Sequence, residues 1–188
     1  MARLPYLNKE DLPPEYQSIL DRPINLNRIL ANSPACRKAT SETGQYIRYG
    51  SKLEARYREL AILQVGYLAR APYEWSHHIK IAHEFDISEN DIAELVALNE
   101  GKPTSFDPKT LAVLTAAREM TVDGAISATT FEQLRAFLDN ALLVDLVVTI
   151  SHYNGVVRLL ASLQVDVEES YIPYLKKFPL PTTPAAAR

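Results

Sequence analysis

The chain has 188 residues, of which 47% are hydrophobic and 23% are charged, so a disordered or low-complexity chain is excluded. The formal net charge is -3, which gives no electrostatic reason to expect nucleic acid or an anionic membrane as a partner. The single cysteine, Cys36, excludes an intrachain disulfide, a CxxC redox pair and a multi-cysteine metal site within one chain.

The N-terminal stretch carries no sign of a targeting segment. It lacks the apolar core of a signal peptide, and Pro5, Pro13 and Pro14 interrupt it. The longest apolar stretch, Ala141–Ile150, is broken by Asp145 and is too short for a bilayer span, which favours a buried helix. These features predict a cytoplasmic protein without a membrane partner.

Apolar positions between about Pro34 and Val165 recur mostly at three- and four-residue spacing, which is the helical period. We therefore predict an all-α fold within a single domain, residues 1–188. Its expected parts are an extended N-terminal arm with a short helical turn (about 1–32), a motif-bearing helical unit (about 33–100), a second helical unit (about 106–178) and a mobile tail (179–188).

Four helices are predicted in the motif-bearing unit. Ser33 and Pro34 suit the N-cap and first positions of the first helix. Ser88 and Asp91 form an acidic relative of the capping box at the start of the fourth. The expected bounds are Pro34 to about Gly50, Ser51 or Lys52 to about Leu68, Pro72 to about Phe85, and Glu89 to about Asn99.

The second unit follows a loop at Asn99–Pro103. Helix formers, caps and apolar runs predict four further elements there. Their expected bounds are Pro108–Met120, Thr129–Leu138, Ala141–Leu163 and a short terminal element, Tyr171–Phe178.

The predicted helix from Pro72 carries an unusual group of polar side chains. Glu74 and His78 are four residues apart, so they lie on one face and can hydrogen-bond. A carboxylate beside an imidazole raises the pKa of the histidine and fixes its tautomer, which prepares a general acid or base. The alternative is a partly exposed pair on a solvated face. His83 is interpreted as a surface or subunit-contact residue.

Other chemistries have less support. Glu74 and His77 form an ExxH pattern like those of di-iron bundles, but a second ExxH does not occur. The further ligands that the sequence offers, Glu59 and His152, are distant from this helix in sequence. We therefore predict no metal. Cys36 lies beside two basic residues, which can lower a thiol pKa, although a small buried cysteine is the favoured interpretation. Hydrolase, dinucleotide and P-loop motifs do not occur.

Three segments together resemble the carboxymuconolactone decarboxylase family, whose superfamily also contains the AhpD-type alkylhydroperoxidases. They are Arg56–Leu63, Ala71–His78 and Ile87–Ile92. The resemblance is strongest over about Leu53–Leu98, and it implies an AhpD-like helical bundle of two packed helical units.

The peroxidase branch of this superfamily carries a glutamate, a CxxC pair and a histidine at fixed spacing. On this chain the glutamate falls on Glu59 and the histidine on His78, while the two cysteine positions fall on Ala71 and Glu74. The chain is therefore similar to the cysteine-free branch, and CxxC-dependent peroxidase activity is not expected.

The resemblance implies proton-transfer or decarboxylation chemistry without a cofactor, of the carboxy-lyase type, on a small lactone or aromatic-derived acid. Such a reaction needs stabilisation of the developing anion and delivery of a proton. The implied catalytic residues are Glu59, Glu74 and His78. The candidate substrate-binding residues are Arg56, Arg58, Trp75 and His152. The alternative for the two arginines is a solvated helix face or a subunit salt bridge. The alternative for Trp75 is a core or interface position, and that for His152 is a buried polar residue satisfied within the bundle.

Two alternatives to a decarboxylase stay open. One is a peroxidase-related protein with residual or lost peroxide activity, and the other is a non-catalytic ligand-binding or assembly module. The resemblance further implies a homo-oligomer, a trimer or a hexamer, with a small-molecule substrate and a role in the catabolism of aromatic compounds.

Overall fold

The structure is a computed structural model that describes residues 1–183, and it is built from helices without a β-strand in that range. The all-α prediction is therefore confirmed. The α-helices are α1 (Asn25–Leu30), α2 (Pro34–Gln45), α3 (Ala55–Leu68), α4 (Pro72–His83), α5 (Glu89–Asn99), α6 (Pro108–Val122), α7 (Ala128–Arg135), α8 (Asn140–Leu163) and α9 (Ile172–Lys177). Shorter turns are η1 (Lys9–Asp11), η2 (Pro14–Leu20), the π-helical η3 (Tyr46–Gly50) and η4 (Glu169–Tyr171).

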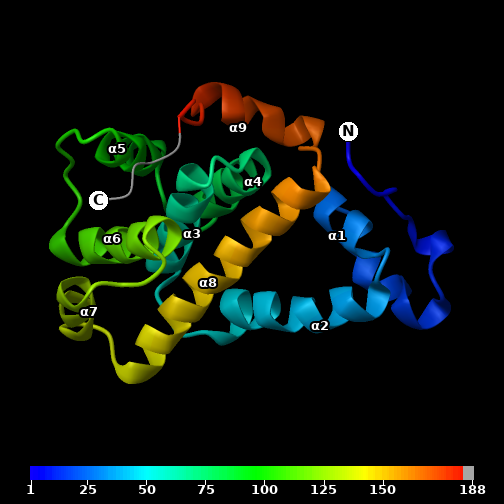
Figure 1. Cartoon of the computed structure of the whole chain (residues 1–188), viewed down its shortest axis with the longest axis horizontal. Coiled ribbons are helices and arrows are strands. Elements are labelled where there is room, and N and C mark those ends of the chain that lie inside the picture. Colours follow the sequence, from blue (N-terminus) through cyan, green and yellow to red (C-terminus); the bar gives the residue numbers. More distant parts are fainter. Residues whose placement is uncertain (184–188) are drawn as a thin grey trace.

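Helix α3 is the centre of the bundle. It packs against α4, α6 and α8, and Figure 1 shows α8 crossing the bundle diagonally, with α2 along one edge and α6 and α7 on the opposite side. Every residue of α3 from Arg58 to Leu68 is buried. Because no face of this part of the helix meets water, its polar residues must find partners inside the fold.

Local signals explain most helix boundaries. The Ser88 backbone N–H donates to Asp91 while the Asp91 N–H donates to the Ser88 hydroxyl, so the predicted capping box forms. Helix α3 begins later than predicted, because Glu54, with ψ 128°, is not in a helical conformation. Helix α4 ends at His83, shortly before Asp86 takes a left-handed conformation with φ 57°.

The N-terminal arm contains more helix than its prolines suggested. Helix α1 was missed, and its first N–H, that of Asn25, donates to the Glu168 carboxylate at 2.7 Å. The Arg3 N–H donates to the Leu163 carbonyl at 2.9 Å. Contacts between residues 141 to 164 positions apart in sequence therefore hold the arm against the end of α8 and the segment that follows it, and a local pattern does not reveal them.

Helix α8 is less buried than predicted. Only 33% of its most apolar window is buried, and Val144 is 60% exposed. The cause is that α8 packs one face on the bundle while its other face points outward. By length and composition, this is the one helix among the described residues that is long and apolar enough to cross a membrane.

The first residues of the predicted mobile tail contact the bundle. Leu180 packs on the cluster around α4, and the Thr182 carbonyl accepts a hydrogen bond from Arg70 at 3.0 Å. The rest of that tail, residues 184–188, lies outside the described residues.

Candidate functional site

The candidate site lies between α3, α4 and α8. Arg70, in a left-handed conformation with φ 51°, turns the chain from α3 into α4, and Pro72 suits the first turn of α4. The two helices approach closely at Gly66, where an added Cβ would lie 3.3 Å from the backbone nitrogen of Trp75. This close packing brings the buried face of α3 against the face of α4 that carries His78.

His78 is held between two carboxylates. Its Nδ1 lies 2.7 Å from Oε2 of Glu59, and its Nε2 lies 2.9 Å from Oε1 of Glu74. The three side chains are buried, with exposed fractions of 10% for His78, 2% for Glu59 and 4% for Glu74. The alternative of a solvated surface pair is therefore wrong.

The fourth charge of the cluster is Arg58. Its Nε donates to Oε1 of Glu59 at 2.9 Å, and its guanidinium lies over the Phe85 ring, 4.7 Å from the centroid. The Nη2 of Arg58 is buried without a hydrogen-bond partner among the described residues. A buried guanidinium nitrogen that the protein leaves unpaired is costly, and an acceptor on a ligand would satisfy it.

The charges of this cluster determine its protonation. Burial opposes the charged form of His78, but the charges of Glu74 and Glu59 and their hydrogen bonds outweigh it and raise the pKa of His78 to about 9. Burial likewise opposes ionisation of Glu59, yet His78 and Arg58 hold the pKa of Glu59 below its ordinary value. At neutral pH the site therefore holds an imidazolium whose two N–H groups both donate to carboxylates.

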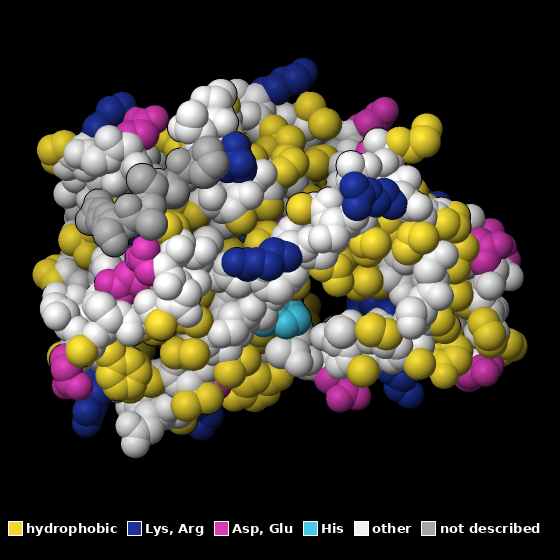
Figure 2. Space-filling model, in the orientation of Figure 1, with side chains coloured by type: hydrophobic (Ala, Val, Ile, Leu, Met, Phe, Trp, Pro, Cys, Tyr) yellow, Lys and Arg dark blue, Asp and Glu magenta, His cyan; other side chains and the backbone are white. Residues whose placement is uncertain are grey.

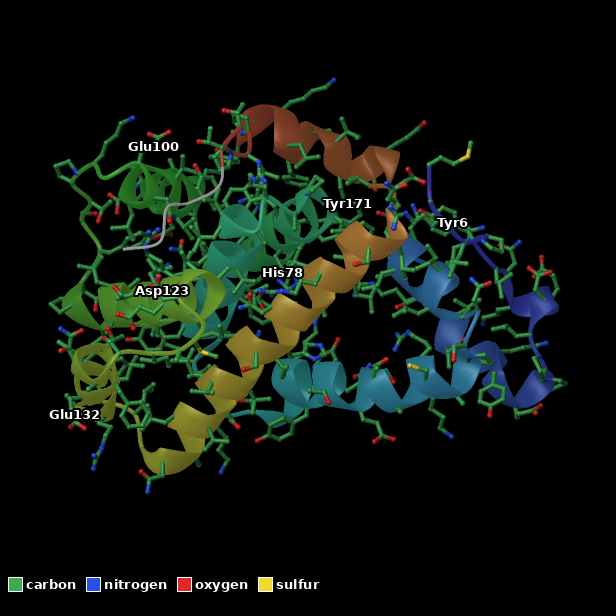
Figure 3. All side chains as sticks on the ribbon, in the orientation of Figure 1. Tyr6, His78, Glu100, Asp123, Glu132 and Tyr171 are labelled. Carbon is green, nitrogen blue, oxygen red and sulfur yellow. The ribbon has the colours of Figure 1, made fainter. Side chains whose placement is uncertain are left out.

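Helix α8 supplies the next wall of the site. The Tyr153 ring meets His78 edge-on, with centroids 5.0 Å apart, and burial raises the pKa of the Tyr153 phenol, so this group is neutral. Burial also lowers the pKa of His152 in spite of the charge of Glu74. In Figure 3, His78 lies beside α8 in the middle of the molecule, and in Figure 2 the surface is hollowed between α8 and α2, with a histidine side chain at the edge of the hollow.

Two predicted substrate-binding residues are engaged elsewhere. Arg56 forms an ion pair with Asp91 of α5, because a position two residues from Arg58 points to another side of α3. Trp75 is fully buried, and its indole N–H donates to the Phe178 carbonyl at 2.8 Å. Trp75 therefore lies in the hydrophobic core, which is the alternative predicted for it. The only hydrogen-bond donor of its side chain is used within the protein.

A second histidine–carboxylate pair was not predicted. The Nε2 of His77 lies 2.7 Å from Oε2 of Glu168, and its ring stacks between Tyr73 and Tyr171, at centroid distances of 4.1 Å and 3.6 Å. The hydrogen bonds of His77 and of the Asn25 backbone outweigh burial and lower the pKa of Glu168 to about 2. This cluster joins α4 to the terminal segments. Glu168 is 91 residues from His77, so no spacing pattern pointed to it.

The structure offers no thiol or metal centre at this site. Ala71 is the residue before α4 and Glu74 pairs with His78, so the two positions that carry cysteines in the peroxidase branch are an alanine and an engaged carboxylate. Cys36 is exposed on α2, which corrects the prediction of a buried cysteine; α2 has no buried residue at all. Within the described part of the chain, no group of three or more side chains is arranged to bind a metal ion.

Comparison of the sequence with protein-family models matches residues 34–119 to the carboxymuconolactone decarboxylase family. This range contains Glu59, Glu74 and His78, whereas His152 lies outside it. A comparison with curated proteins gave no match.

Solved structures share the fold. An uncharacterized peroxidase-related protein with an alkylhydroperoxidase AhpD core, from Ralstonia eutropha JMP134, is 18% identical, with 93% of this chain and 95% of that chain covered and a TM-score of 0.78. A variant of the debrominase Bmp8 in complex with 2,3,4-tribromopyrrole is 16% identical over 95% of this chain and 98% of that chain, with a TM-score of 0.77. An uncharacterized peroxidase-related protein from Silicibacter sp. TM1040 is 18% identical over 90% and 92%, with a TM-score of 0.72. At these identities the likeness shows the fold, which is AhpD-like.

Proposed function

Because residues 34–119 carry the sequence pattern of the carboxymuconolactone decarboxylase family, we propose that the protein catalyses proton transfer with decarboxylation of a small lactone or aromatic-derived acid, without a cofactor. The observation that carries this proposal is the buried ring of His78, held between the carboxylates of Glu59 and Glu74. A proton donor that stays charged at neutral pH, in a site shielded from water, is what the second half of such a reaction requires.

The reaction needs no further reagent. The bond between the substrate carboxylate carbon and the ring breaks, CO₂ leaves, and the electron pair is taken up by a conjugated lactone or enone carbonyl. The imidazolium of His78 then gives a proton to the ring carbon. His78 becomes neutral and regains a proton from water through Glu74 or Glu59.

Arg58 is the residue we assign to the substrate carboxylate. Its Nε is held by Glu59, while its Nη2 is buried and unpaired among the described residues. Guanidinium and carboxylate match in geometry and charge. A substrate acid bound there lies next to the Glu59–His78 pair, because Arg58 and His78 share the same Glu59 carboxylate as partner. We propose His152 of α8, which is partly buried and whose pKa is lowered by burial, as a further substrate contact.

We do not propose peroxide chemistry by a thiol relay, although structural neighbours are described as peroxidase-related. That relay needs two cysteines at the positions of Ala71 and Glu74, and the one cysteine of this chain is exposed on another helix. A ligand-binding module without turnover remains the second hypothesis, and the following experiment separates it from the enzyme.

Turnover of a carboxymuconolactone by the His78→Ala variant tests the proposal. We expect kcat to fall by about 10²- to 10⁴-fold relative to the unmodified chain, because the proton donor is lost. His83→Ala is the matched control, since His83 is an exposed histidine of the same helix. Release of CO₂ is followed together with the melting temperature, so that loss of folding is recognised.

Full activity of His78→Ala would show that the proton donor is a different group. If aromatic acids raise the melting temperature of the unmodified chain more than that of Arg58→Gln, but no acid loses CO₂, a binding module at Arg58 is favoured over the enzyme.

We further propose that the protein works in the cytoplasm as a homo-oligomer. Val144 of α8 is 60% exposed and Tyr49 of η3 is 73% exposed, and the hydroxyl of the half-exposed Tyr46 donates to Asp145, which places η3 beside α8. Exposed apolar residues of this kind suit a subunit interface. The mass in solution should be three or six times the chain mass of 21.1 kDa, and a monomer at micromolar concentration would contradict the proposal.

A further inference from the structure

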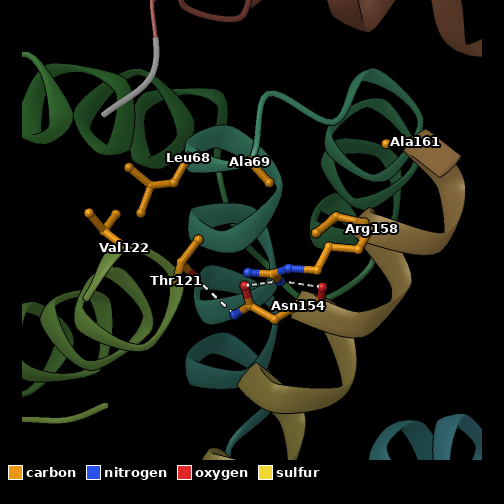
Figure 4. Close-up of a pocket in the computed structure, with 8 residues that line it drawn as sticks. Leu68, Ala69, Thr121, Val122, Asn154, Arg158 and Ala161 are labelled. Carbon is orange, nitrogen blue, oxygen red and sulfur yellow. Dashed lines mark hydrogen bonds between the residues drawn. The ribbon is translucent and has the colours of Figure 1, made fainter. Parts of the chain in front are cut away.

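A cavity of about 360 Å³ lies between the C-terminal ends of α3 and α6 and the second half of α8 (Figure 4). Its volume is at the lower end of the range of ligand pockets, roughly 300–1,000 Å³. The wall is formed by Leu68, Ala69, Thr121, Val122, Asn154, Val157, Arg158 and Ala161. None of these residues belongs to the Glu59–Glu74–His78 cluster, so the cavity is a separate place on the molecule.

The three polar residues of the wall bind one another. Asn154, which is 9% exposed, donates to the Thr121 hydroxyl at 3.0 Å and to the Ile150 carbonyl at 3.1 Å. The Thr121 hydroxyl donates in turn to the Ala117 carbonyl. Oδ1 of Asn154 accepts a hydrogen bond from Nη1 of Arg158 at 2.9 Å, and the Asn154 carbonyl accepts a second one from the same nitrogen. The donors of Asn154 and Thr121 are therefore used within the protein.

Arg158 is the exception in this wall. Asn154 fixes its guanidinium through Nη1, and the remaining nitrogens, Nε and Nη2, have no hydrogen-bond partner in residues 1–183. No carboxylate of that range forms an ion pair with Arg158 either. Arg158 is an exposed residue, so these nitrogens are accessible from solvent. A guanidinium that is positioned by Asn154, has no counter-charge and lies beside the apolar side chains of the wall has the chemistry that recognises a carboxylate.

We propose that this cavity binds a small apolar carboxylic acid, with its carboxylate on Arg158 and its apolar body against Leu68, Val122 and Val157. A phosphate fits less well, because only one guanidinium offers free donors and the donors of Asn154 and Thr121 are used within the protein. The site is independent of the reaction proposed at His78, and it stands whether or not the chain has decarboxylase activity.

Benzoate is the probe for this site, and benzamide, with the same ring and no charge, is its neutral counterpart. Titration calorimetry of the full chain gives Kd for each. We expect benzoate to bind more tightly than benzamide, and Arg158→Gln to weaken benzoate binding at least about tenfold through loss of the charge-assisted pair. Ala161→Trp, which fills the cavity from its rim, should abolish binding of both ligands.

Arg135→Gln is the matched control, because Arg135 is an exposed arginine of α7 outside the cavity wall. It should bind benzoate as the unmodified chain does. Two results would overturn the proposal: no binding of benzoate to the unmodified chain at millimolar concentration, or equal binding to Arg158→Gln. The second result would assign benzoate to another cation, such as Arg58.

Discussion

Replacing His78 with leucine is expected to lower the free energy of unfolding by about 3–5 kcal/mol at pH 7. The imidazolium pairs with two carboxylates, Glu59 and Glu74, whose side chains are only 2% and 4% exposed. Without His78, Glu74 loses its ion-pair partner and Glu59 keeps only Arg58. Urea unfolding curves of the two proteins measure the difference.

The matched control is His83→Leu, on the exposed side of the same helix, which should change stability by less than about 1 kcal/mol. Adding Glu74→Gln to His78→Leu should recover part of the lost stability, because it removes the unpaired buried charge. A loss below about 1 kcal/mol in His78→Leu itself would contradict a charged His78 between two buried carboxylates.

The second expected result is a loss of stability as the pH rises from about 6.5 to about 9. The pKa of His78 is about 9 in the folded chain against an ordinary value of 6.5. Between these values the folded state holds a proton that the unfolded state has released, so unfolding releases a proton and becomes easier as the pH rises. The contribution of His78 is complete below about 6.5 and disappears above about 9, and it amounts to roughly 3 kcal/mol.

Unfolding free energies at several pH values across this window measure the slope. The His78→Gln variant is the control, because it has no titrating imidazole at this position and should lack that part of the slope. A stability of the unmodified chain that is flat from pH 6.5 to 9 would show that His78 is neutral in the folded state.

The sequence was most informative where a signal is local. Helix α5 has the predicted bounds because Ser88 and Asp91 satisfy the N–H groups at its start, and the Glu74–His78 contact followed from their spacing on one helix. Glu59, on another helix, was found only through the family resemblance, because 19 residues separate it from His78.

Other features depend on the direction in which a side chain points from α3. Arg56 and Arg58 are chemically alike and two residues apart, about 200° around α3, so the sequence did not show that Arg58 joins Glu59 while Arg56 pairs with Asp91. Helix α1 was missed for a related reason. Its first N–H is bound by Glu168, and this partner lies 143 residues further along the chain.

The close approach of α3 and α4 at Gly66 has a consequence for acid strength. Gly66 lies two turns after Glu59 on α3, and Trp75, whose backbone it meets, lies one turn before His78 on α4. A Cβ at position 66 would lie 3.3 Å from the backbone nitrogen of Trp75, so α4 would have to shift by a few tenths of an ångström, and we expect the 2.7 Å contact between Glu59 and His78 to lengthen. Because attraction between charges weakens with distance, the pKa of His78 would then move back toward that of free histidine. Glycine at position 66, because it has no Cβ, thus helps to keep the proton on His78.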